Sequence, residues 1–127
     1  ICTYLPKISC FDEFSNYIDK LPDTGPRVIM LFTGQKNEDG INWCRYCVTA
    51  EPVIEAYLSE VQINIVFTTV VVGNREYWKN LECPFRTDNR ILIHGLPTLI
   101  RWKGVQRLVG EQCSQKDLIK MLVEDEE

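Results

Sequence analysis

The chain has 127 residues, 45% of them hydrophobic and 25% charged, and a formal net charge of −4. This length suits a single domain, residues 1–127, with a substantial hydrophobic core, and no apolar run approaches the roughly 18 residues of a membrane helix. The acidic balance argues against nucleic acid or an anionic membrane as a partner, because both attract basic surfaces.

The N-terminal part of the chain predicts a strand, a helix and a buried strand. Residues 3–9 lean apolar but contain a proline, which favours an edge strand. Ser9 and Asp12 resemble a capping box, and apolar residues then recur every three or four positions, which is typical of an amphipathic helix. Residues 28–32 form a continuous apolar run, which is typical of a strand buried on both faces of a parallel sheet.

The middle of the chain predicts a long helix between two central strands. Residues 33–42 are polar and contain glycine, which indicates a surface loop. Helical spacing of apolar residues then predicts a helix from about Cys44 to Glu60, with Pro52 expected to kink it. Residues 63–72 are β-branched and aromatic, so a second central strand and a strand–helix–strand crossover are expected.

The segment after this strand predicts short helices and a hairpin. Residues 74–92 mix charged and aromatic side chains with breakers, which indicates one or two short helices. A strand follows Pro97 and turns at Lys103 and Gly104 into a partner strand at about residues 106–109.

The end of the chain predicts a last helix and a tail. Ser114 and Asp117 are expected to cap this helix, whose apolar positions are Leu118, Ile119 and Leu122. Residues 124–127 are acidic and are expected to fray.

Two cysteines separated by two residues mark the start of the long helix, in the run Trp43-Cys44-Arg45-Tyr46-Cys47. The unpaired N–H groups and positive dipole end of a helix start favour the thiolate at Cys44, which is therefore the predicted nucleophile. Cys47 lies one turn further on and can attack a mixed disulfide at Cys44, so it is the predicted resolving cysteine. Arg45 adds a cation that is expected to lower the thiol pKa further.

The remaining cysteines bear on a metal site and on the compartment. Half of a zinc site has the same spacing, but further ligands would have to come from Cys83, Cys113 or His94, which stand isolated in different segments, so no metal is expected. With Cys2 and Cys10, the scattered cysteines form no obvious disulfide framework and are interpreted as structural or incidental, which favours a reducing compartment. The first residue is not methionine and no secretory signal follows, which leaves N-terminal processing open.

The element order and three motifs resemble the thioredoxin fold. The motifs are Trp43 directly before Cys44, Pro52 eight residues after that cysteine, and Leu96-Pro97-Thr98 before the hairpin. The resemblance implies an α/β thioredoxin fold, with a central mixed sheet flanked by helices. It also implies that Leu96, Pro97 and Thr98 form the family's cis-proline loop, which faces the dithiol and offers backbone groups to an extended substrate.

A closer resemblance covers essentially the whole chain and is to the thioredoxin-related 14 kDa protein family, also called thioredoxin domain-containing protein 17. It rests on Phe32-Thr33-Gly34, the long loop to Gly40, Trp43-Cys44, Cys47-Val48, Ala50-Glu51-Pro52, Gly73, Tyr77-Trp78-Lys79, Phe85-Arg86 and Pro97-Thr98-Leu99. That family implies a cytosolic disulfide reductase which receives electrons from NADPH through thioredoxin reductase. Its members act on small disulfides such as cystine and on selected proteins, including a dynein light chain.

The sequence departs from the family pattern between the two cysteines, where Arg45-Tyr46 stands in place of Pro-Asp. A cation stabilises a thiolate and makes the disulfide more oxidising, so a higher reduction potential is expected. Thioredoxins also carry a buried Asp where Leu31 stands here, so that proton acceptor for Cys47 is absent from its usual position. Glu51 could substitute for it, although a solvent-facing carboxylate is the simpler interpretation.

Two residues keep a second interpretation, and one loop carries a further prediction. Trp43 either shields the sulfurs or packs in the core, and Pro97 is either the cis-proline that contacts substrate or an ordinary proline at a strand entry. The loop of residues 35–41 is longer than in most thioredoxins and is predicted to select small or particular substrates.

These observations predict an enzyme, a protein-disulfide reductase in which Cys44 attacks and Cys47 resolves, with Trp43, Arg45 and Tyr46 modulating the pair. No bound cofactor is expected, and the electron source is a thioredoxin-reductase-type enzyme or the glutathione system. The expected partners are disulfide-containing small molecules or proteins, and the expected form is a cytoplasmic monomer. The alternatives are a redox-sensing or interaction module with little turnover, and an oxidase or isomerase in a secretory compartment.

Overall fold

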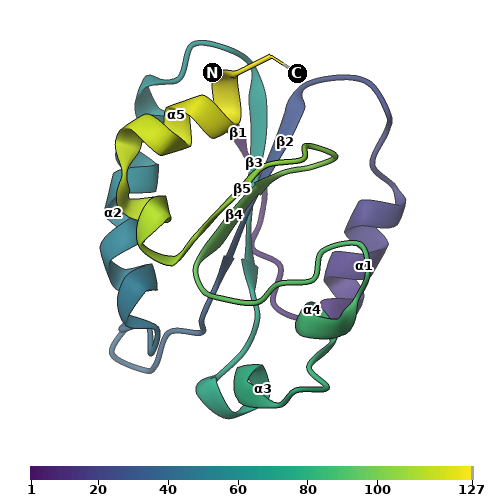
Figure 1. The fold of residues 1–127 in the computed structure, drawn as a ribbon, viewed down its shortest axis with the longest axis vertical. Coiled ribbons are helices and arrows are strands. Elements are labelled where there is room, and N and C mark those ends of the chain that lie inside the picture. Colours follow the sequence, from purple (N-terminus) through teal and green to yellow (C-terminus); the bar gives the residue numbers. More distant parts are fainter. Residues whose placement is uncertain (127) are drawn as a thin grey trace.

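The computed structural model describes residues 1–126, which form helices packed on both faces of a five-stranded sheet (Figure 1). The elements are β1 (Cys2–Tyr4), α1 (Phe11–Asp19), β2 (Arg27–Thr33), α2 (Arg45–Glu60), β3 (Ile65–Val71), α3 (Arg75–Lys79), α4 (Pro84–Thr87), β4 (Thr98–Arg101), β5 (Arg107–Val109), a 3₁₀ turn (Gly110–Ser114) and α5 (Lys116–Glu124). None of the helices within residues 1–126 is both long and apolar enough to cross a membrane.

The sheet is mixed, with strand order β1-β3-β2-β4-β5. The first three strands in this order run parallel, and β4 and β5 pair antiparallel. The predicted edge strand is therefore β1, and the two predicted central strands, β2 and β3, are direct neighbours. The α/β thioredoxin fold with a mixed sheet is confirmed.

Two hydrophobic layers hold the helices to the sheet. In β2 the side chains alternate, so that Met30 and Phe32 enter one layer and Ile29 and Leu31 the other. Figure 1 shows α1 and α4 on one side of the sheet and α2 and α5 on the other. Burial on both faces explains why this strand is a continuous apolar run.

Both predicted helix caps are wrong. The cap of α1 is Cys10, whose side chain accepts no backbone N–H of the helix. The Glu13 carboxylate instead accepts from the Ser9 N–H at 3.3 Å and from the Cys10 thiol at 3.6 Å. The cap of α5 is Gln115, because Ser114 still belongs to the 3₁₀ turn. The buried side chain of Cys113 holds the 3₁₀ turn against the core. A turn this short leaves no periodic pattern in the sequence, so the sequence did not predict it.

The C-terminal acidic residues are partly anchored. Glu124 ends α5 and accepts a hydrogen bond from the hydroxyl of Tyr57 at 2.7 Å. The expectation that the tail frays from residue 124 is therefore wrong for Glu124, and Glu127 lies outside the described residues.

Candidate active site

The two cysteines lie where the loop after β2 enters α2. Cys44 is the residue that caps α2, with extended backbone angles of φ −87° and ψ 111°. Its sulfur accepts a hydrogen bond from the backbone N–H of Cys47 at 3.3 Å. The sulfur thus satisfies one of the N–H groups that every helix start leaves unpaired.

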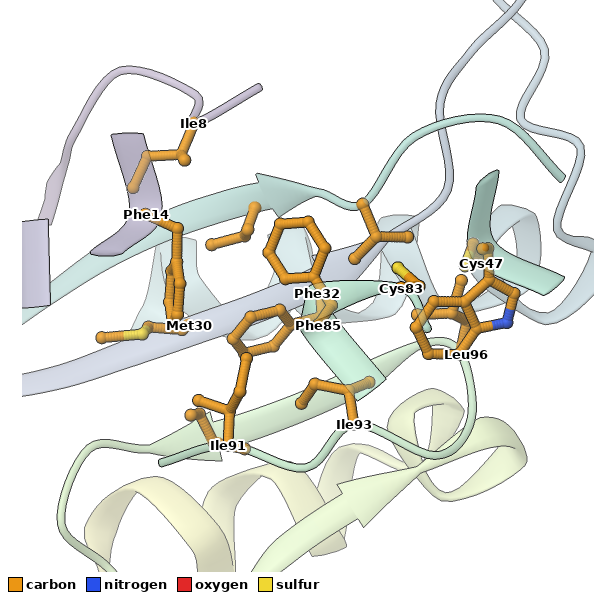
Figure 2. Close-up of a cluster of buried hydrophobic side chains, with 14 of the residues drawn as sticks. Ile8, Phe14, Met30, Phe32, Cys47, Cys83, Phe85, Ile91, Ile93 and Leu96 are labelled. Carbon is orange, nitrogen blue, oxygen red and sulfur yellow. The ribbon is translucent and has the colours of Figure 1, made fainter. Parts of the chain in front are cut away.

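The two sulfurs differ in their access to solvent. Both cysteines are free thiols; Cys44 is 7% exposed and Cys47 is 0% exposed. Figure 2 shows Cys47 at one end of a buried hydrophobic cluster, near Leu96. A disulfide in solution can therefore reach Cys44 but not Cys47.

The two thiols also differ in pKa, and the cause is the same geometry. Hydrogen bonds from Cys47, and a further one from the Tyr46 backbone, lower the pKa of Cys44 from 9.0 to about 7, against the opposing effects of burial and of the Glu51 charge. The pKa of Cys47 is raised, because its thiol hydrogen bonds to Cys44 and is buried. Near neutral pH about half of the Cys44 sulfur is therefore thiolate, whereas the buried Cys47 sulfur is a thiol.

The ring of Trp43 is held from several sides. Its Nε1–H donates to the carbonyl of Gly73 at 2.9 Å. The guanidinium of Arg75 lies 5.5 Å from the ring centroid and donates to the Trp43 carbonyl at 3.3 Å. A Cβ at Gly34 would lie only 2.8 Å from the ring, so glycine is required there for this close packing. Trp43 is half-buried and both packs in the core and lines the nucleophile.

Asn42 organises the loop immediately before the nucleophile, and the sequence reasoning missed it. It is 5% exposed. Its Nδ2 donates to the Thr33 hydroxyl at 3.0 Å and to the Gly34 carbonyl at 2.8 Å. Its Oδ1 accepts from the backbone N–H of Cys44 at 2.9 Å, the bond to the residue two positions on that asparagine often makes in turns. An asparagine two residues before a predicted helix cap was the available signal.

Thr33 and Glu51 form a polar contact beside Cys47. The Thr33 hydroxyl donates to Glu51 Oε1 at 3.2 Å. Thr33 also acts to lower the pKa of Cys47, against the larger effects that raise it. The other carboxylate oxygen lies 3.5 Å from Nζ of Lys36, and the Glu51 side chain is 21% exposed. Glu51 is thus partly exposed and combines both interpretations, because one carboxylate oxygen meets Thr33 at the end of β2 and the other meets Lys36 at the surface.

The loop of Leu96, Pro97 and Thr98 borders the cysteine pair. The Leu96–Pro97 peptide bond is cis, and Leu96 packs in the same cluster as both active-site cysteines. All three side chains are buried, which leaves backbone groups as the contacts this loop can offer. The Pro97 carbonyl accepts from the Gly110 N–H at 2.8 Å and from the Cys113 thiol at 3.6 Å.

The other predicted positions divide between surface and core. Arg45 and Tyr46 are exposed beside the nucleophile, and His94 is exposed on a loop. Cys83 is 2% exposed and lies in the cluster of Figure 2, so it is a buried thiol of the core. Within residues 1–126, no three His, Cys, Asp or Glu side chains are grouped so that they could hold a metal ion.

Comparison with known sequences gives a consistent result. The model of a family described as thioredoxin domain-containing protein 17-like, thioredoxin domain, matches residues 7–125. Thioredoxin domain-containing protein 17 of Homo sapiens is 33% identical over 119 residues, covering 94% of this chain and 94% of that protein. Its counterpart in Danio rerio is 39% identical over 98 residues, covering 77% of this chain and 78% of that protein.

Two more distant proteins extend the comparison. The thioredoxin-like protein Clot of Arabidopsis thaliana is 37% identical over 76 residues, covering 60% of this chain and 57% of that protein. The crystal structure of a reduced thioredoxin pre-protein of Schistosoma mansoni superposes with a TM-score of 0.51 at 16% identity, covering 93% of this chain and 100% of that chain. The structural likeness shows the fold.

Proposed function

This chain belongs to the thioredoxin domain-containing protein 17-like family, and we propose that it is a thiol-disulfide oxidoreductase that reduces disulfides with Cys44 and Cys47. A thioredoxin-like redox role follows from the family itself. The finer assignment as a disulfide reductase is supported chiefly by one observation, the acidified and accessible sulfur of Cys44 beside the buried thiol of Cys47.

The reaction consists of two thiol-disulfide exchanges. The Cys44 thiolate attacks one sulfur of a substrate disulfide, so that a mixed disulfide forms at Cys44 and the first substrate thiolate leaves. Cys47 then loses its proton and attacks the Cys44 sulfur, which forms the Cys44–Cys47 disulfide and releases the second substrate thiolate. Two electrons pass to the substrate, and an external reductant must return them to the cysteine pair.

The identity of substrate, reductant and compartment is part of the proposal. The resemblance of this chain to the thioredoxin-related 14 kDa protein family favours small disulfides such as cystine, and selected proteins, as substrates. Electrons would come from NADPH through a thioredoxin-reductase-type enzyme or from the glutathione system, with no cofactor bound to this chain. The absence of a disulfide framework among the six cysteines favours a reducing compartment such as the cytoplasm.

The first test is the reduction potential of the cysteine pair, measured by titration against glutathione, with Cys44→Ser as control. A value near about −270 mV supports a reductase, whereas a value above about −200 mV indicates an oxidant or isomerase. If no couple titrates, a binding module becomes the better explanation.

Turnover provides the second test. The purified chain is assayed with NADPH, a thioredoxin reductase and cystine, and consumption of NADPH is followed. Cys44→Ser should abolish turnover, whereas Cys47→Ser should accumulate a mixed disulfide that mass spectrometry detects. If Cys47→Ser accumulates no such species, the proposed order of attack is wrong.

A further inference from the structure

Arg75 holds a guanidinium group beside the residue that precedes the nucleophile. Its Nη2 donates to the Trp43 carbonyl at 3.3 Å, and its guanidinium carbon lies 5.5 Å from the centroid of the Trp43 ring. This carbonyl belongs to the planar peptide bond that joins Trp43 to Cys44. The donating nitrogen of Arg75 therefore lies within about 6 Å of the Cα atom of Cys44.

The backbone next to Arg75 is tied to the same tryptophan, which holds the cation in place. The Nε1–H of Trp43 donates to the carbonyl of Gly73, two residues before Arg75, at 2.9 Å. Asn74 caps α3, because its Oδ1 accepts from the Tyr77 N–H at 2.9 Å. A side chain that is already held in place loses less conformational entropy when it binds a ligand.

The guanidinium of Arg75 still has donors to offer. A guanidinium carries five N–H donors in a planar fork. Among residues 1–126, Trp43 is the only hydrogen-bond partner of the Arg75 side chain, and no carboxylate forms an ion pair with it. The side chain is also exposed. Because the fork matches the geometry of a carboxylate, Arg75 is suited to bind a carboxylate that approaches the nucleophile.

The space beside Arg75 can hold part of a substrate. Arg75 and Trp43 line a hollow of about 370 Å³ together with Lys36 and Glu76. Glu76 opposes an anion there, and Lys36 lies 3.5 Å from the Glu51 carboxylate, which offsets its charge. Arg75 is therefore the cation of this hollow that is left to attract an anion.

Arg45 is the other cation beside the nucleophile, and it differs from Arg75 in how it is held. Both side chains are exposed. Within residues 1–126 the side chain of Arg45 makes no hydrogen bond or ion pair, whereas Arg75 is stacked on Trp43. Arg75 is thus the cation with a defined position relative to Cys44.

A carboxylate on the substrate can reach Arg75 during the first exchange. In the mixed disulfide the substrate sulfur lies about 2 Å from the Cys44 sulfur. A carboxylate carbon three bonds further on lies about 4 Å from that substrate sulfur. The Arg75 nitrogen lies within about 9 Å of the Cys44 sulfur, so a hydrogen bond of about 3 Å can join it to the carboxylate.

We propose that Arg75 is a specificity-determining residue, which pairs with a carboxylate on the half of the disulfide that becomes attached to Cys44. A free amino-acid disulfide and a C-terminal cysteine carry this carboxylate, whereas inside a peptide chain it is an amide. The exchange itself is unchanged. The Cys44 thiolate bonds to the nearer sulfur, the substrate S–S bond breaks, and the other half leaves as a thiolate with the electron pair.

This inference rests on the proposed function, and one assay distinguishes the two. In Cys47→Ser the mixed disulfide at Cys44 is not resolved, so its formation can be followed by acid quenching and peptide mass spectrometry. The probes are dithiodipropionate, which is anionic, bis-hydroxyethyl disulfide, which is neutral, and cystamine, which is cationic. If none of the three adds to Cys44, the proposed function itself fails, whatever Arg75 does.

Arg75→Gln, made in the Cys47→Ser protein, is the test of the inference. The ratio of the anionic to the neutral rate constant should fall by about three- to fivefold at low salt, as is typical for the loss of an exposed ion pair. The ratio of the cationic to the neutral rate constant should rise, because a repulsive charge is removed. Both changes should shrink in about 1 M salt, which screens charges beyond about 3 Å.

Lys79→Gln is the matched control. It removes the same charge from the same short helix, and Lys79 is exposed and makes no hydrogen bond or ion pair within residues 1–126. Both ratios should stay as they are in the parent protein. Equal slowing of all three probes in Arg75→Gln would show that Arg75 only supports Trp43, and this overturns the inference. Unchanged ratios in Arg75→Gln, or the same shift in Lys79→Gln, overturn it as well.

Discussion

The backbone N–H of Cys47 donates to the sulfur of Cys44 at 3.3 Å, so the nucleophile itself occupies the position of a helix-capping side chain. Serine or aspartate at such a position stabilises a helix by about 1 kcal/mol. Here the capping atom is the Cys44 sulfur, whose pKa these hydrogen bonds lower to about 7, so the helix start stabilises the reactive thiolate form.

The first prediction concerns the pH dependence of alkylation. Because only the thiolate reacts, the rate of Cys44 with iodoacetamide should rise with pH and reach half its maximum at about pH 7. Below this pH the sulfur is protonated, and the rate should fall by about tenfold per pH unit. Mass spectrometry of the labelled protein measures the rate at each pH.

Cys47→Ala is the matched control for this profile. It removes the thiol hydrogen bond that is the largest cause of the lowered Cys44 pKa, so the midpoint should move up toward 9.0. If the midpoint is the same in both proteins, the hydrogen bond from Cys47 is not the cause.

The second prediction concerns the dipeptide between the cysteines. Arg45→Pro combined with Tyr46→Asp removes a cation and adds an anion beside the thiolate. The reduction potential should fall, by on the order of 30 mV for each 1.4 kcal/mol of lost stabilisation. Both side chains are exposed, so the change should act through charge and weaken at high salt. An equal or higher potential in the double variant contradicts the prediction.

The third prediction concerns the loop of residues 35–41. Asn37 organises this loop, because its side chain accepts from the N–H groups of Asp39 and Ile41 at 2.9 and 3.0 Å. Replacing residues 37–40 by a short glycine linker should raise the rate of insulin reduction, measured by turbidity, because a bulky disulfide gains access to Cys44. Cystine reduction serves as the control and should change little; an unchanged insulin rate means that the loop is not the filter.

The fourth prediction concerns stability. Asn42→Leu leaves the buried N–H of Cys44 and the carbonyl of Gly34 without these partners, at a cost of about 1–3 kcal/mol per group. The free energy of unfolding in a urea titration should therefore fall by at least about 2 kcal/mol. Asn37→Leu on the exposed loop is the comparison and should cost less. Equal losses in the two variants would show that burial of Asn42 is not what matters.

Much of the fold follows from local patterns. The helix from Cys44 to Glu60 was predicted because apolar residues repeat at helical spacing, and the observed α2 spans Arg45–Glu60 with Cys44 as its cap. The cis peptide before Pro97 was expected only through the resemblance to thioredoxins, and the structure has it. Local patterns and the family motifs thus located both halves of the candidate site.

The polar network was less predictable, because its bonds join residues that no periodic pattern relates. The bond from Asn42 to Thr33 spans nine residues and depends on how the loop folds back. Glu51 follows Cys47 by one helical turn, so helical spacing predicts that the two residues share a face of α2. It does not predict which residues pack against that face. Only the folded chain shows that the face meets the end of β2.

The two buried cysteines outside the active site lie in different hydrophobic layers. Cys83 is part of the layer under α1 and α4, and Cys113 is part of the layer under α2 and α5. Burial leaves them 2% and 0% exposed, so an alkylating reagent can reach each of them only when its own layer opens. Their separate labelling rates in mild urea would therefore measure whether the two sides of the sheet come apart together or one before the other.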